Sequence, residues 1–115
     1  MIGIKESFQS ASNSPLFAEG EVVHHKRYGY RGVIVRSDLI CEAEDDWYQS
    51  NQTQPDCNQP WYHVLVDCSD ITTYVAESNL ESDEGGQTVH HPLIDVFFSG
   101  FKNESYIRND EPWPG

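Results

Sequence analysis

Residues 61–77 read WYHVLVDCSDITTYVAE, and this stretch contains the clearest structural signal in the sequence. Two β-prone runs, residues 61–67 and 71–77, are joined by Cys-Ser-Asp, which are residue types common in turns. The pattern predicts a β-hairpin. In the first run, apolar side chains occupy both alternating faces, which is typical of a strand covered on both sides, as in a small closed barrel.

A second hairpin is predicted upstream of the first. Residues 21–26 and 32–37 are β-prone, and the Tyr-Gly-Tyr sequence of residues 28–30 suits a tight connection between two strands. Residues 42–51 have the composition of a short helix with an acidic first turn, where negative charge complements the helix dipole. We therefore expect a mostly β fold with one short helical excursion.

The last third of the domain has weaker signals. Residues 81–86 are polar and acidic, which predicts a spacer. A turn is expected at Gly100, and residues 105–108 form a last β-like run.

Both ends of the chain are polar. Residues 1–15 are rich in serine, which predicts a disordered or loosely held tail before a single domain over residues 16–108. Residues 109–115 form a short C-terminal tail. In this tail Trp113 stands between two prolines without an obvious core position, so it is a candidate for an exposed contact.

Composition and charge exclude several functions. The 115 residues include 19 acidic and 7 basic side chains, for a formal net charge of −12, and 37% of the residues are hydrophobic. No apolar run approaches the roughly 18–20 residues needed to cross a bilayer, so we expect no membrane-spanning role. The negative charge also disfavours a broad nucleic-acid-binding surface, because its field repels a polyanion.

Basic side chains nevertheless gather at one place. Residues 22–36 hold four basic groups and no acidic ones, and two tyrosines lie among them. Three interpretations are open: a solvated rim whose arginines pair with carboxylates, a contact surface for a protein or peptide, and a contact surface for DNA. The candidate contact residues are Lys26, Arg27, Tyr28, Tyr30, Arg31 and Arg36.

The cysteines and histidines predict no metal site. Three cysteines cannot all pair, and their spacing is not that of structural zinc ligands. We expect free thiols in a reducing cytoplasm, with a Cys41–Cys57 bridge as the alternative. The N-terminus lacks the apolar stretch of a secretory signal. Adjacent His24 and His25 point to opposite faces of a strand, so they cannot easily share one ion. We expect neither a metal nor a cofactor.

Side-chain types of a nucleophilic site occur near the predicted hairpin turn, in His63, Cys68, Ser69 and Asp70. Serine and aspartate are common in turns because their side chains bond to nearby backbone groups. The sequence has no glycine-framed nucleophile turn and no phosphate-cradling loop. We therefore expect no enzymatic activity.

Several strings of residues occur together in a recognisable order. They are VHHKRYGYRGVI at 23–34, QPWYHVLVD at 59–67, TYVAE at 73–77, NL at 79–80 and HPL at 91–93. Together they resemble the hemimethylated-DNA-binding, or YccV-like, family, which includes the bacterial heat-shock protein HspQ. The resemblance extends over residues 17–108. It departs from the family pattern at Cys68, where glycine is common, and at Ser78, where a glutamate is typical.

The resemblance implies a small SH3-like barrel without enzymatic activity. It also implies mainly structural roles for the motif positions, which are His25, Gly32, Trp61, Tyr62, His63, Asp67, Tyr74, His91 and Pro92. Two functions are associated with the family: binding of hemimethylated DNA, and a part in stress response and protein turnover with an ATP-dependent protease or its client proteins. The domain also occurs attached to protein-degradation adaptors.

An acidic domain suits protein partners better than DNA. We therefore expect a cytoplasmic, non-catalytic module that works through protein contacts, with recognition of hemimethylated DNA as the alternative. The family's small barrels also form oligomers, so we expect that self-association can accompany either role.

Overall fold

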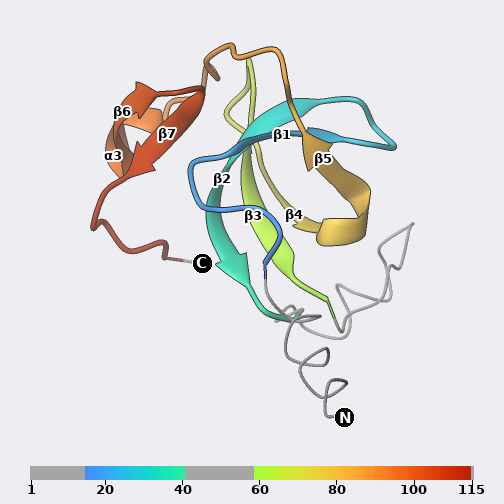
Figure 1. The fold of residues 1–115 in the computed structure, drawn as a ribbon. Coiled ribbons are helices and arrows are strands. Elements are labelled where there is room, and N and C mark those ends of the chain that lie inside the picture. Colours follow the sequence, from blue (N-terminus) through green and yellow to red (C-terminus); the bar gives the residue numbers. More distant parts are fainter. Residues whose placement is uncertain (1–14, 41–58, 115) are drawn as a thin grey trace, which may run out of the picture.

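The computed structural model describes residues 15–40 and 59–114, which form a mostly β structure, as expected (Figure 1). Five strands form one antiparallel sheet in the order β4-β3-β2-β1-β5, and β6 and β7 form a separate pair. The strands are β1 (Val22–His25), β2 (Arg31–Asp38), β3 (Trp61–Val66), β4 (Thr72–Ala76), β5 (Leu80–Ser82), β6 (Phe98–Lys102) and β7 (Ser105–Arg108). Two short helical elements accompany them, η1 (Glu77–Asn79) and α3 (Ile94–Phe97).

Both predicted hairpins are confirmed. β1 pairs antiparallel with β2, β3 pairs antiparallel with β4, and the β2–β3 ladder joins the two hairpins into one sheet. At the β3–β4 turn, Ser69 Oγ donates to Val66 O at 2.8 Å and accepts from the Ile71 N–H at 3.0 Å. This is the local bonding for which serine favours turns.

Hydrophobic side chains pack on both faces of the central strands. In β3, Leu65 belongs to one buried cluster and the preceding Val64 to the other, as alternation along a strand requires. The first cluster includes Phe97 and Phe98, and Figure 1 shows α3 and the β6–β7 pair standing together beside the main sheet. The second cluster receives Phe17 from the segment before β1. The prediction that residues 61–66 form a strand covered on both sides is confirmed.

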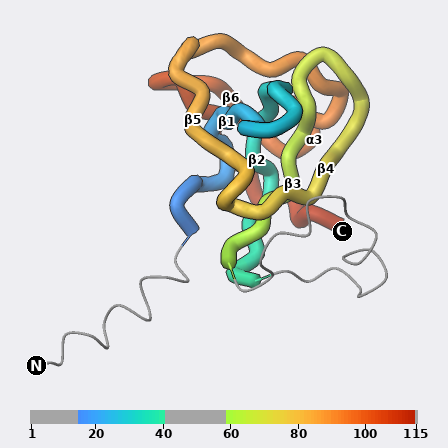
Figure 2. Tube along the Cα trace, turned by 90° about the vertical axis from the view of Figure 1, so that its right-hand side faces the viewer, coloured from blue at the N-terminus to red at the C-terminus, as the bar shows by residue number. Residues whose placement is uncertain are grey.

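The five-stranded sheet is open. β4 and β5 are its two edge strands, and the three residues of η1 connect them, a course that Figure 2 shows from a second direction. The Glu77 N–H donates to Pro60 O at 2.9 Å, and the Lys26 N–H donates to Asn79 O at 2.8 Å, so both ends of η1 are tied to the sheet. No ladder joins β4 to β5 in the described residues, so a closed SH3-like barrel is not confirmed.

Two expectations for the last third of the chain are wrong. Residues 81–86 are not wholly a spacer, because Glu81 and Ser82 belong to β5 and pair with β1. Gly100 lies within β6, and the turn to β7 is made by Asn103 and Glu104, with φ angles of 55° and 67°. Two consecutive residues in the left-handed region match the twist of the flanking strands, which explains the position of this turn.

Trp113 is not an exposed contact. It is half-buried against the first cluster, with its ring centroid 5.2 Å from Phe97 and 5.5 Å from His63. The C-terminal segment therefore contributes an aromatic ring to the core, and the expectation of a solvent-facing side chain is wrong.

Several other expectations lie outside the described residues. They are the helix over residues 42–51, the Cys41–Cys57 bridge, and nearly all of the tail over residues 1–15. Among the helices that the structure describes, none has the length and apolarity to span a bilayer.

Candidate functional site

The β1–β2 turn carries most of the candidate contact residues. His25 supports this turn from beneath: its Nδ1 accepts the Arg27 N–H at 3.1 Å and the Tyr28 N–H at 3.0 Å. The Tyr28 and Tyr30 rings lie 4.7 and 5.0 Å from its ring. Because Nδ1 accepts two hydrogen bonds and the ring is buried, the turn requires neutral His25.

We call Lys26, Arg27, Tyr28 and Tyr30 the turn patch. Lys26, Arg27 and Tyr28 are exposed, and the Arg27 guanidinium carbon lies 5.7 Å from the centre of the Tyr28 ring. The Tyr30 hydroxyl bonds to Thr73 Oγ1 at 2.9 Å, which joins the patch to edge strand β4. Among the described residues, neither Lys26 nor Arg27 has an ion-pair partner. The patch therefore offers two cations beside an exposed aromatic ring.

Arg31 is separated from the turn patch by its ion pairs. Its Nη1 donates to Asp67 Oδ2 at 2.7 Å and its Nε donates to Asp83 Oδ2 at 3.0 Å. Its Nη2 donates to the Gln87 carbonyl at 2.8 Å. The guanidinium thus donates to acceptors from the β3–β4 turn and from the chain after β5, and these contacts engage its Nε, Nη1 and Nη2 atoms.

Asp67 takes part in a second set of contacts at the same place. Its Oδ1 accepts the His90 N–H at 2.7 Å. Burial acts to raise the pKa of Asp67, but this bond and the Arg31 charge outweigh burial and hold the pKa below its ordinary value. Charged Asp67, in the β3–β4 turn, therefore connects this turn to Arg31 of β2 and to His90 in the chain after β5.

Arg36 lies at the far end of β2. Its Nε is 3.4 Å from Asp38 Oδ1, and Asp38 is buried. The other oxygen of Asp38 accepts the Tyr74 hydroxyl at 2.7 Å and lies 3.5 Å from His63 Nε2. Arg36 is itself exposed, but it lies at the other end of β2, so Lys26 and Arg27 are the two exposed cations of the cluster that the β1–β2 turn carries.

The remaining motif positions lie in the framework. Tyr62 donates its hydroxyl to Glu77 Oε2 at 2.7 Å and accepts the Phe17 N–H at 3.2 Å, and burial raises its pKa. His91 Nε2 lies 3.0 Å from Ile71 O, and its Nδ1 accepts the Leu93 N–H at 3.1 Å. Trp61 and Gly32 are buried within the sheet, and Pro92 is exposed beside His91.

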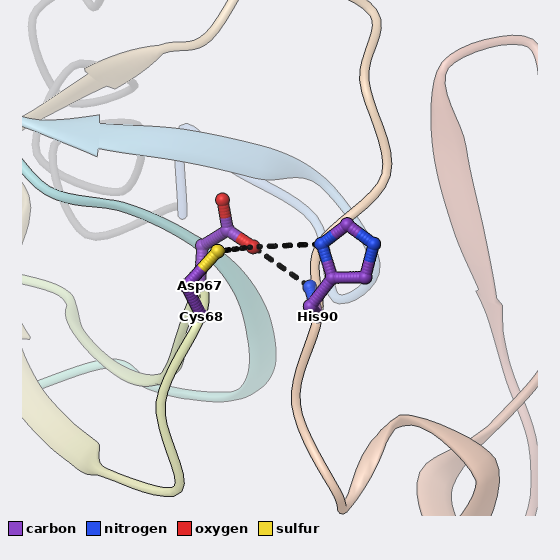
Figure 3. A group of neighbouring side chains, drawn as sticks. All are labelled: Asp67, Cys68 and His90. Carbon is purple, nitrogen blue, oxygen red and sulfur yellow. Dashed lines mark hydrogen bonds and ion pairs between the residues drawn. The ribbon is translucent and has the colours of Figure 1, made fainter.

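Four titratable residues that bond to the candidate residues are not distinguished by any pattern in the sequence. They are Asp38, Glu77, Asp83 and His90. Asp83 lies in the predicted acidic spacer, where nothing distinguishes it from its neighbours. His90 approaches Cys68 and Asp67, and these three form the one group among the described residues whose atoms could hold a metal ion (Figure 3).

Stability is expected to fall when the pH is lowered below about 6.5, the ordinary pKa of histidine. Burial, and then the nearby His24 and Arg27, lower the pKa of His25 in the folded state. The unfolded chain therefore binds the proton first as the pH falls, so the contribution of neutral His25 is present above about 6.5 and is lost on acidification. Urea unfolding between pH 7.5 and 5 checks this.

His25→Asn provides the comparison, because the amide oxygen accepts hydrogen bonds but does not titrate. The variant should lose less stability than the wild type over the same pH range. A His25 ring that titrates by NMR at or above the value of an unfolded peptide would contradict the prediction.

The fold and the turn patch define a small antiparallel β domain that presents cationic and aromatic side chains on one strand-connecting turn. The chain belongs to the YccV-like family: the model described as "Hemimethylated DNA-binding protein YccV like" matches residues 15–105. This confirms the resemblance drawn from the sequence.

Curated relatives carry the same domain within longer chains. Over 98 residues, the chain is 35% identical to F-box only protein 21 of Mus musculus, and the match covers 83% of this chain and 16% of the relative. It is 34% identical to F-box only protein 21 of Homo sapiens, with 83% and 15% covered. The chain thus spans about a sixth of the length of these relatives.

Proposed function

We propose that this domain is a non-catalytic regulatory module that acts through protein contacts in cytoplasmic protein turnover and stress response. The turn patch would bind an ATP-dependent protease or one of its client proteins. The observation that carries the proposal is the pairing of Arg31 with Asp67 and Asp83, and of Arg36 with Asp38. Two of the four clustered cations are thus paired with carboxylates. Lys26 and Arg27 have no ion pair among the described residues, and they form a small cationic patch on an acidic domain.

The remaining charge is small for a nucleic-acid surface. With two phosphate contacts, from Lys26 and Arg27, the logarithm of the DNA association constant would fall with the logarithm of the salt concentration at a slope of only about −2. Specific DNA complexes have larger positive surfaces. In contrast, tyrosine and arginine are the residue types that dominate the energetics of protein interfaces. Tyr28 is 56% exposed beside Arg27, so the patch suits a protein contact.

The alternative is recognition of hemimethylated DNA through the same patch. The description of the family favours it. In this role Arg27 and Tyr28 would supply polar and apolar contacts to a methylated base edge. The SH3-like barrel implied by the resemblance also stays a proposal, supported by the way η1 links the two edge strands.

Fluorescence anisotropy with hemimethylated, fully methylated and unmethylated duplexes separates the two functions. We expect weak binding without preference among the three duplexes. The logarithm of the association constant should fall with the logarithm of the salt concentration at a slope of about −2. Arg27→Glu should weaken it further, and Lys102→Glu, an equal charge change at an exposed site on β6, should weaken it less. A preference for the hemimethylated duplex above about tenfold, abolished by Arg27→Glu, would establish the DNA role instead.

Native affinity capture tests the protein role. The wild-type chain should retain subunits of an ATP-dependent protease or its clients. Tyr28→Ala/Arg27→Ala should lose them, because it removes the proposed contact residues. Both side chains are exposed, so their removal leaves the hydrophobic core in place. Equal retention by Lys102→Ala and the wild type serves as the control. Recovery of DNA without a protease or client protein would contradict the proposal.

A further inference from the structure

Three side chains with metal-binding atoms meet beside the β3–β4 turn (Figure 3). Cys68 Sγ lies 3.6 Å from Asp67 Oδ1, and His90 Nδ1 lies 3.6 Å from the same oxygen. All three atoms lie within 4.8 Å of one another. Zinc bonds of about 2.0–2.3 Å place tetrahedral ligand atoms roughly 3.3–3.8 Å apart, so two of the three separations already match this geometry.

The segments that carry these ligands are held together by the backbone. The Cys68 N–H donates to His90 O at 2.8 Å, and the His90 N–H donates to Asp67 Oδ1 at 2.7 Å. Arg31 holds the other oxygen of Asp67 at 2.7 Å. Metal-bound carboxylates are commonly oriented by such a partner, so Asp67 is positioned without the help of an ion.

The other two side chains are held more loosely: the Cys68 thiol donates a hydrogen bond to Asp67 Oδ1, and the His90 ring pairs with the same oxygen, both at 3.6 Å. The His90 side chain is exposed, and its backbone alone makes the contacts that close the turn. Cys68 is exposed and has a φ of 60°, a conformation that glycine adopts at lower cost. A thiol and an imidazole thus flank a fixed carboxylate, and neither is required by the packing.

The local charge suits a divalent cation. Asp67, Asp83 and a Cys68 thiolate carry three negative charges, and Arg31 carries one positive charge. The net charge of −2 is neutralised by one Zn²⁺. A set of one sulfur, one nitrogen and one oxygen ligand favours zinc over magnesium or calcium, which prefer oxygen alone.

We propose that Asp67, Cys68 and His90 bind one Zn²⁺ through Oδ1, Sγ and Nδ1. Water completes the tetrahedral coordination, as in zinc sites with three protein ligands. The Cys68 thiol releases its proton to solvent on binding, because the thiolate is the ligand. The ion would join the β3–β4 turn to the chain after β5, next to Arg31.

Isothermal titration of the chelator-treated protein with Zn²⁺ tests this site. The titration uses a Cys41→Ser/Cys57→Ser background, in which Cys68 is the sole thiol. We expect uptake of one Zn²⁺ per chain, weakened by more than about tenfold in Cys68→Gly and in His90→Ala, since loss even of groups that only support ligands costs 10–100-fold. Glycine is favoured at φ 60°, so Cys68→Gly should retain the fold.

Two further measurements make the outcome decisive. His24→Ala is a control that removes a histidine of β1, whose Nδ1 lies 3.2 Å from Glu81 Oε2. This variant should leave the zinc affinity unchanged. Co²⁺ should produce thiolate charge-transfer absorption that Cys68→Gly abolishes. If the serine background proves unstable, the wild type and Cys68→Gly alone should differ by one bound zinc. Absence of stoichiometric uptake, or uptake unaffected by Cys68→Gly and His90→Ala, would overturn the proposal.

Discussion

Arg31→Ala is expected to lower the free energy of unfolding by about 2 kcal/mol, between the cost typical of breaking an exposed ion pair and that of breaking a buried one. The side chains of Arg31, Asp67 and Asp83 are 23%, 17% and 16% exposed. Without the guanidinium, Asp83 loses its ion pair, and Asp67 keeps only the contacts that its Oδ1 makes with Cys68 and His90. Urea unfolding at neutral pH measures the loss.

Arg27→Ala is the matched control for Arg31→Ala. Arg27 lies four residues away in the same basic cluster, but it is exposed and has no ion pair among the described residues, so its loss should change stability by less than about 0.5 kcal/mol. If the two variants differed by less than about 1 kcal/mol, Arg31 would not be the structural tie that its contacts indicate. The difference also explains why Arg27, and not Arg31, is the position at which to test binding.

Gly32→Ala is expected to destabilise the domain by about 3 kcal/mol, through overpacking between β2 and β3. A Cβ atom at this position would lie 2.5 Å from Val64 Cγ1 and 2.6 Å from the Leu65 carbonyl oxygen. The backbone oxygen cannot move without disturbing the β2–β3 ladder, which is the centre of the sheet. Chemical unfolding measures the change, and a lowered midpoint with the same slope is the expected result.

Gly100→Ala is the control for Gly32→Ala. Gly100 is also a strand glycine, but its added Cβ would meet only Ile107 Cδ1, at 3.8 Å, an ordinary contact distance. This variant should be neutral or slightly stabilising, because alanine reduces the entropy of the unfolded chain. Equal destabilisation by the two substitutions would show that close packing at Gly32 is not the cause.

The turn patch could be predicted from the sequence because Lys26, Arg27, Tyr28 and Tyr30 are neighbours in one predicted turn. The division of the basic cluster could not. Arg31 is bonded to residues 36 and 52 positions away, and no local pattern shows which of 19 acidic side chains will reach it. The approach of His90 to Cys68 has the same origin, since it depends on where the chain after β5 crosses the β3–β4 turn.

Local sequence specifies the two hairpins, the last strand and the family, because alternating side chains and turn residues act over a few positions. Three features required the tertiary structure. They are the pairing of β5 with β1, the burial of Trp113 and the loss of Arg31 from the exposed cations. Each results from contact between residues far apart in the chain, where geometry and burial, and not residue type, decide which groups meet.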